Sequence, residues 1–101
     1  MGNRIELQQK LEELLGLRHV YYQPPSSVKM EYPAIVYAKQ GIHPRHADNT
    51  IYLINKRYSV TVISRIPDDP VIDKLLMLPY CSYDRSYKED NLYHDVLTLY
   101  H

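Results

Sequence analysis

The sequence predicts an α+β domain, in which two helices pack on one face of a mainly antiparallel sheet of four to five strands. Three observations predict it: a leucine stripe near the start, a proline- and aspartate-rich helix-start signal after the middle, and two tyrosine-rich β-prone runs at the end. The order of elements is α-(β)-β-β-α-β-β. A chain of 101 residues forms one domain, 1–101, with a modest core.

The first helix is expected over 4–15, where leucines recur at helical spacing and form one stripe. These are Leu7, Leu11, Leu14 and Leu15. Asn3 with Glu6 three residues later resembles a capping box, and Gly16 is a natural stop. The helix therefore has a start, an apolar face and an end.

The first half of the sheet follows a break in the chain. Residues 19–22 form a short β-prone run before the Pro- and Ser-rich breaker 23–27. Residues 33–38 are expected to form a buried strand, with Pro33 at a position that a strand tolerates. Gly41 and Pro44 then predict that 40–49 is the longest loop. We expect order to return at 51–54.

Residues 56–66 carry the strongest strand signal, because apolar or β-branched residues occupy both of its faces. Such a strand lies near the middle of a sheet or beneath a helix. Asp69 as N-cap and Pro70 at the first helical position start a second helix, which ends before Pro79. The polar stretch 88–91 separates the runs 80–87 and 92–100, so the chain is expected to end in a β-hairpin.

Composition restricts the function. Twelve basic and twelve acidic residues cancel, which disfavours non-specific nucleic-acid binding. All eleven aromatic residues are tyrosine, which suits half-exposed strands and a protein-binding surface equally well. A lone cysteine, Cys81, indicates a reducing compartment and a structural role. We expect no signal peptide, because Met1 to Arg4 lead directly into an amphipathic segment, and no membrane span.

No constellation of residues predicts catalysis or a cofactor. His43, His46 and Asp48 lie close in sequence, but Pro44 disrupts the regular spacing that would direct both imidazoles to one metal ion. His94 and Asp95 are adjacent in a strand and point to opposite faces. We therefore expect no enzyme, no cofactor and no metal site.

The end of the chain reads Asp90-Asn91-Leu92-Tyr93-His94 followed by Val96-Leu97-Thr98-Leu99-Tyr100. This segment resembles the end of the tail-completion (tail-terminator, minor capsid) proteins of long-tailed phages and prophages. Further similarity lies in residues 19–25 and 30–37, in 48–49 with Tyr52 and 56–63, and in 68–78. The similarity thus covers most of the chain after Gly16, and its residues are structural.

The resemblance implies a virion component, assembled in the bacterial host cytoplasm, that forms a ring of typically six copies at the head-proximal end of the tail. The ring would end growth of the tail tube, with the tail-tube protein and head connector proteins as partners. We place subunit contacts in 40–54 and at the exposed strand edge, and predict Arg45, Tyr52 and Arg57 as interface residues. Whether a ring forms without the tube, and whether the role is tail termination or head closure, stays open.

Two other functions are compatible with the residues. A nucleic-acid-binding module would stack bases on tyrosines near Lys56, Arg57 and Lys88, although the zero net charge counts against it. A small enzyme would use the histidines of the predicted loop, His43 and His46. A structural assembly protein is the prediction that we favour over both.

Overall fold

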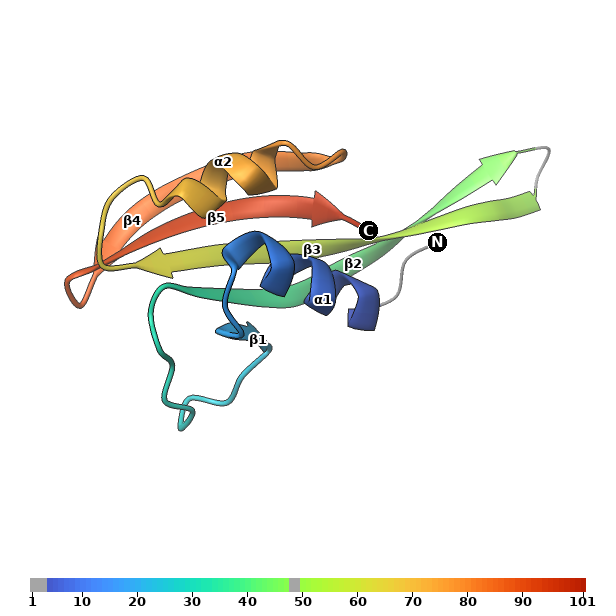
Figure 1. The fold of residues 1–101 in the computed structure, drawn as a ribbon. Coiled ribbons are helices and arrows are strands. Elements are labelled where there is room, and N and C mark those ends of the chain that lie inside the picture. The colour runs from blue at the N-terminus through green and yellow to red at the C-terminus, as the bar shows by residue number, and fades with distance from the viewer. Residues whose placement is uncertain (1–3, 48–49) are drawn as a thin grey trace.

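The computed structural model of the chain describes residues 4–47 and 50–101, and side chains outside 41–55. Within these residues the chain forms two helices and a five-stranded sheet (Figure 1). The elements are α1 (Arg4–Leu15), β1 (Val20–Tyr22), β2 (Ala34–Ala47), β3 (Thr50–Ser64), α2 (Pro70–Leu76), β4 (Cys81–Glu89) and β5 (Leu92–Tyr100). The predicted α+β class and element order are confirmed.

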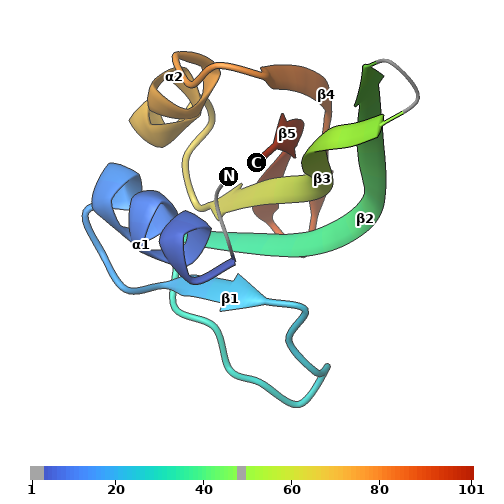
Figure 2. The same ribbon diagram turned by 90° about the vertical axis from the view of Figure 1, so that its right-hand side faces the viewer.

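The strands lie in the order β1-β2-β3-β5-β4, so β3 is the central strand, as its apolar residues on both faces predict. Neighbouring strands are antiparallel except β1, which runs parallel to β2 with Val20 opposite Ile35. The sheet is therefore mixed and mostly antiparallel. Both helices lie side by side on the same, concave face of the curved sheet (Figure 2).

The core lies between this face and the two helices. Alternation along the strands directs Ile35, Val60 and Leu97 toward the helices, and all three are almost fully buried. Leu7 and Leu11 of the predicted leucine stripe cover them from α1, and Leu14 and Leu15 pack at the edge of the same cluster. From α2 the buried residues are Val71, Ile72 and Leu75.

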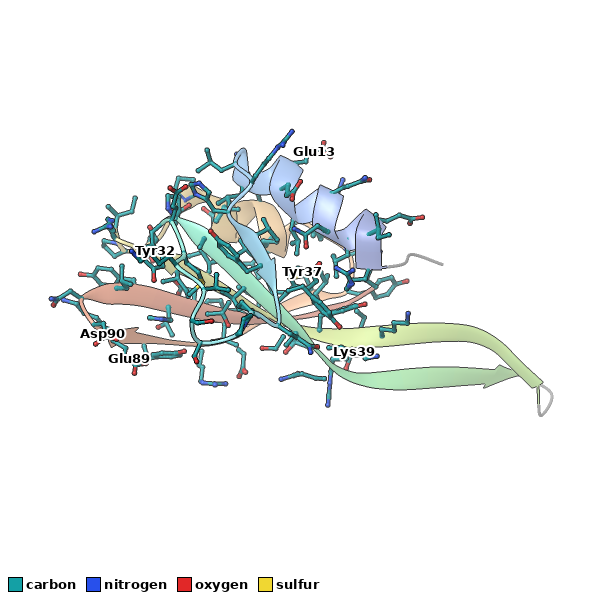
Figure 3. The ribbon with its side chains drawn as sticks, turned by 90° about the horizontal axis from the view of Figure 1, so that it is seen from below. Glu13, Tyr32, Tyr37, Lys39, Glu89 and Asp90 are labelled. Atoms are coloured by element: carbon teal, nitrogen blue, oxygen red, sulfur yellow. The ribbon has the colours of Figure 1, made fainter. Side chains whose placement is uncertain are left out.

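Two tyrosines belong to the core. Tyr37 is 0% exposed and Tyr58 is 1% exposed, and the Tyr37 hydroxyl donates a hydrogen bond to the Gln8 side-chain oxygen beneath α1 (Figure 3). Burial raises the pKa of both phenols. Tyr80, Tyr83 and Tyr87 are instead exposed. The tyrosines thus divide between the core and the surface.

Gly16 ends α1 and Asp69 caps α2, as the sequence predicts. Gly16 follows α1 with a φ of 78°, and its N–H donates to the Glu12 carbonyl at 2.9 Å. Asp69 caps α2, because its carboxylate accepts a hydrogen bond from the Val71 N–H at 3.0 Å. The second carboxylate oxygen of Asp69 accepts from the Ser64 hydroxyl at 3.1 Å, which joins the cap to the end of β3.

The C-terminal hairpin is confirmed, with a tighter turn than predicted. Only Asp90 and Asn91 separate β4 from β5, and their φ angles are 52° and 61°. Two consecutive residues with positive φ make the primed turn that matches the twist of a hairpin. β4 is an edge strand, and every residue in it except Cys81 is exposed.

The prediction of a loop at 40–49 is wrong. β2 continues to Ala47 and pairs with β3 up to Thr50, so the segment is the end of a long hairpin. The register shifts between Lys39 and Gly41 and again between Arg45 and His46. Such irregularities, together with the position of this part of β2 at a sheet edge, admit Gly and Pro inside a strand. Because it pairs with β2 along its length, β3 is one strand that includes the predicted ordered segment 51–54. It ends at Ser64, two residues before the predicted end at Ile66.

Candidate assembly surfaces

A two-stranded arm projects from the body of the molecule. β1 pairs with β2 only as far as Tyr37, and β5 pairs with β3 only as far as Arg57, so among the described residues no third strand extends the sheet beyond them. We call residues 41–47 with 50–55 the arm. Figure 1 shows it extending past the helices, and the molecule measures 50 × 25 × 22 Å.

The arm has the composition of a contact element. Its sequence contains Ile42, Ile51, Leu53 and Ile54. The radius of gyration of the chain is 14.4 Å, against about 13 Å for a compact chain of this length. A two-stranded hairpin is at best marginally stable alone in water. An apolar arm of this kind gains stability when a partner covers it.

The three predicted interface residues lie on this hairpin. Arg45 pairs with Leu53 in the distal part, and Tyr52 falls at the register shift between that pair and His46 opposite Ile51. Their side chains lie outside the described residues. Arg57 lies at the base of the arm, opposite Gly41 on one side and Tyr100 on the other. The Arg57 Nε is buried and has no hydrogen-bond partner within the part of the chain that the structure describes.

The base of the arm is tied to the C-terminus. The His101 N–H donates to the Lys56 carbonyl at 2.9 Å, and the Lys56 N–H donates to the His101 carbonyl at 3.2 Å. A cleft of about 550 Å³ opens beside this contact, between the start of α1 and the segment that follows α2. Its lining is largely apolar, including Leu7, Leu78 and Leu99. The pair of backbone hydrogen bonds fixes where the arm leaves the body.

A second surface is a groove of about 310 Å³ between α2 and β4. It is lined by Asp68, Asp69, Ile72, Asp73, Leu76, Tyr83 and Asp95. The residues that line it include four carboxylates and neither lysine nor arginine. Sequence reasoning assigned Asp68 and Asp69 to capping and did not connect them with Asp95, because only the packing of α2 across the sheet brings them together.

Hydrogen bonds hold the wall of this groove. The Tyr83 hydroxyl donates to the Asp95 carboxylate at 2.6 Å, and this bond raises the pKa of Tyr83 above its usual value. Asp69 is engaged by Ser64 and Val71 as described above. Asp68 and Asp73 are exposed.

Large apolar side chains are also exposed at the end of α2 and in the segment that follows it. Leu76 is 39% exposed, Met77 86% and Tyr80 70%. They follow one another from the end of α2 to the start of β4. Exposed apolar side chains grouped in this way characterise binding surfaces.

Side chains capable of acid–base or nucleophilic chemistry do not cluster among the described residues. The His94 ring stacks on Tyr87 at 4.6 Å, whereas Asp95 binds Tyr83 on the other face, as the strand alternation predicts. Burial raises the pKa of the Cys81 thiol, which disfavours the nucleophilic thiolate. The side chains of His43 and His46 lie outside the described residues. Among those described, no group of three or more His, Cys, Asp or Glu could hold a metal ion.

The basic residues that a nucleic-acid site would need are separated. Arg57 is opposite Tyr100 and Lys88 is opposite Tyr93, so the two positions are at different ends of β5. Seven residues of strand correspond to about 23 Å. Lys88 is also held over the Tyr93 ring at 5.1 Å. Lys88 therefore does not form one basic patch with Lys56 and Arg57.

No model of a known protein family, no curated protein sequence and no solved structure matches the chain. None of the helices among the described residues has the length and apolar character that a membrane span requires.

Proposed function

We propose that this chain is a structural phage or prophage protein that assembles as a ring at the head-proximal end of the tail, ends growth of the tail tube and joins the tail to the head. The observation that carries this proposal is the projecting arm, an apolar two-stranded element on a small body. The role in the virion is supported by the resemblance of residues 19–25, 30–37, 48–49 with Tyr52, 56–63, 68–78 and the terminal hairpin to tail-completion proteins.

The arrangement of the body favours head-to-tail contacts. The arm extends toward one end of the molecule, and the β3–α2 linker and the β4–β5 turn lie at the other (Figure 1). An interface between two different surfaces repeats from copy to copy and produces a ring when the rotation closes. A projecting arm that reaches a neighbour is a simple device for this kind of contact.

A cyclic ring has two different faces, as a protein that joins the tail tube to the head requires. All copies in a cyclic ring have the same orientation along its axis, so its two faces present different residues. One face then binds the last ring of the tail tube, and the other binds the head connector. Growth of the tube ends because the outer face does not reproduce the surface that accepts another tube subunit.

The first test is the solution mass, measured by light scattering during size-exclusion chromatography over a wide concentration range, with negative-stain electron microscopy of the same fractions. We expect a mass of about 72 kDa, six times the 12.0 kDa of one chain, and closed rings in the images. A mass of 12.0 kDa at every concentration would contradict self-assembly. Dimers with two-fold symmetry would contradict the head-to-tail arrangement.

A further inference from the structure

The segment that joins β1 to β2 lies on the surface of the molecule. We call residues 24–33 the strap. Figure 2 shows it as an open loop that extends away from both helices, and residues 25–29 are all exposed. Near its end, the Glu31 N–H donates a hydrogen bond to the Tyr21 hydroxyl at 3.2 Å. Two further contacts at the same end involve His19, which precedes β1.

The His19 ring contacts the end of the strap through both of its nitrogens. Nε2 lies 2.8 Å from a carboxylate oxygen of Glu31, and Nδ1 lies 3.2 Å from the carbonyl oxygen of Pro33. The backbone of His19 is bonded to the sheet, because its carbonyl accepts a hydrogen bond from the Ile35 N–H at 2.9 Å. A residue fixed to the body therefore connects two residues of the strap.

The two contacts of the ring together require its charged form. A carboxylate and a backbone carbonyl accept hydrogen bonds and donate none, whereas a neutral imidazole has a single N–H. The neutral ring can donate to Glu31 or to Pro33, and its other nitrogen then directs a lone pair at the second acceptor. The imidazolium has two N–H groups, so it is the form that satisfies both acceptors at once.

The groups around the ring differ in how they respond to pH. Glu31 is the charged group that contacts the ring among the described residues. The other titratable or charged groups on the surrounding elements are Glu12 and Glu13 of α1, Arg18, Tyr21 of β1, Lys29 and Tyr32 of the strap, and Arg65 after β3, whose guanidinium lies over the Tyr32 ring at 5.7 Å. Carboxylates, lysine, arginine and tyrosine keep one charge state between about pH 5.5 and about pH 8.5, whereas histidine changes its charge in this range. A response of the strap to pH near neutrality is therefore assigned to His19.

We propose that His19 is a pH-dependent latch, which holds the strap against the body when its ring is charged and releases it when the ring is neutral. The proposal goes beyond the proposed function and does not depend on assembly. As the pH rises, the ring loses one proton and with it one of its two contacts. The Glu31 side chain is 78% exposed, so water solvates its carboxylate once the ring no longer donates to it. The residues of the described core cluster lie outside the strap, so its release leaves the body folded.

Cleavage by trypsin after Lys29, an exposed residue of the strap, measures how readily the strap opens. A synthetic peptide of residues 24–33 in the same tube gives the cleavage rate of the unattached sequence. Division by this rate cancels the pH dependence of the protease itself. The normalised rates are compared at about pH 5.5 and about pH 8.5 at one chain concentration, after circular dichroism has established that the body is folded at both.

We expect the normalised rate of the original chain to be about five- to tenfold higher at the upper pH, the low end of what a hydrogen bond between charged groups contributes, because Glu31 is exposed. His19→Ala should be cleaved rapidly at both pH values. Glu31→Gln should be cleaved slowly at both, because an amide accepts from the charged ring and donates to the neutral one. His94→Ala is the matched control, since it removes a histidine of β5 and should keep the pH dependence of the original chain.

Two results would overturn the latch. One is a normalised rate of the original chain that is the same at both pH values. The other is a pH dependence that persists in His19→Ala or in Glu31→Gln. Either result leaves the proposed function intact, because the solution mass and the images of the assembly test that function separately.

Discussion

The cap of α2 gives the sharpest stability prediction. Asp69 uses its two carboxylate oxygens on different partners: one accepts from the Val71 N–H at 3.0 Å and the other accepts from the Ser64 hydroxyl at 3.1 Å. Ser64 is 4% exposed, and among the described residues it is the one buried polar residue. Asp69→Ala therefore removes an N-cap and also leaves a buried hydroxyl without its acceptor.

The two losses can be estimated separately. Loss of an N-cap costs about 1 kcal/mol, and loss of the acceptor of a buried hydroxyl costs about another 1 kcal/mol. The sum, about 2 kcal/mol of unfolding free energy, corresponds to a fall in Tm of about 8–16 °C for a domain of this size. Asp69→Ser keeps a capping oxygen, so we expect it to recover roughly half of the loss.

Thermal unfolding followed by circular dichroism at one chain concentration measures these effects, because assembly makes Tm depend on concentration. Asp68→Asn is the control, since it removes the neighbouring charge and asparagine tolerates the positive φ of 54° found there. The double variant with Ser64→Ala isolates the hydroxyl contact, with an expected coupling of about 1 kcal/mol. If Asp69→Ala lowers Tm no more than Asp68→Asn does, the account of the cap is refuted.

Three further predictions concern the core and the last turn. Leu11→Ala, at a site with 0% exposure, is expected to lower the free energy of unfolding in urea by about 2–5 kcal/mol. Leu17→Ala is the control, with an expected cost near zero because Leu17 is 43% exposed. A cost near zero for Leu11→Ala as well would contradict the packing of α1. Asn91→Val is expected to cost about 1–2 kcal/mol because a β-branched residue is strained at positive φ, and Asn91→Gly should cost nothing. Burial raises the pKa of Tyr37, so the folded state keeps a proton that the unfolded chain releases above about pH 10. This contribution to stability is present below about pH 10 and is lost as the pH rises toward the folded pKa, so Tyr37→Phe should lose less stability than the original chain between about pH 9 and 11; equal losses would contradict it.

The sequence predicts the elements whose signals are local. Gly16 and Asp69 act within one turn of the residues that they stop or start, so both helices could be placed from the chain alone. Tyr58, Val60 and Val62 on one face, with Thr61 and Ile63 on the other, predict the central strand, because a strand of this kind has few other places in a sheet.

The features most relevant to assembly depend on partners that are distant in sequence. Gly41 and Pro44 favour a loop when considered alone, yet pairing with β3 draws both into a strand, with the irregularity absorbed in register shifts. The parallel pairing of β1 with β2 also has no local signal. The groove is a further case, since Asp68 and Asp95 are brought together only when α2 packs over β4 and β5.

The most direct test of the account compares the original chain with one whose arm is excised, in which a two-residue turn replaces residues 41–55. The shortened chain keeps every residue of the described core cluster, so it is expected to fold and to give the circular dichroism of the body. Light scattering should then find about 72 kDa for the original chain, six times 12.0 kDa, and the mass of a single chain for the excised one. The same state of assembly in both proteins would contradict the claim that the arm joins the copies.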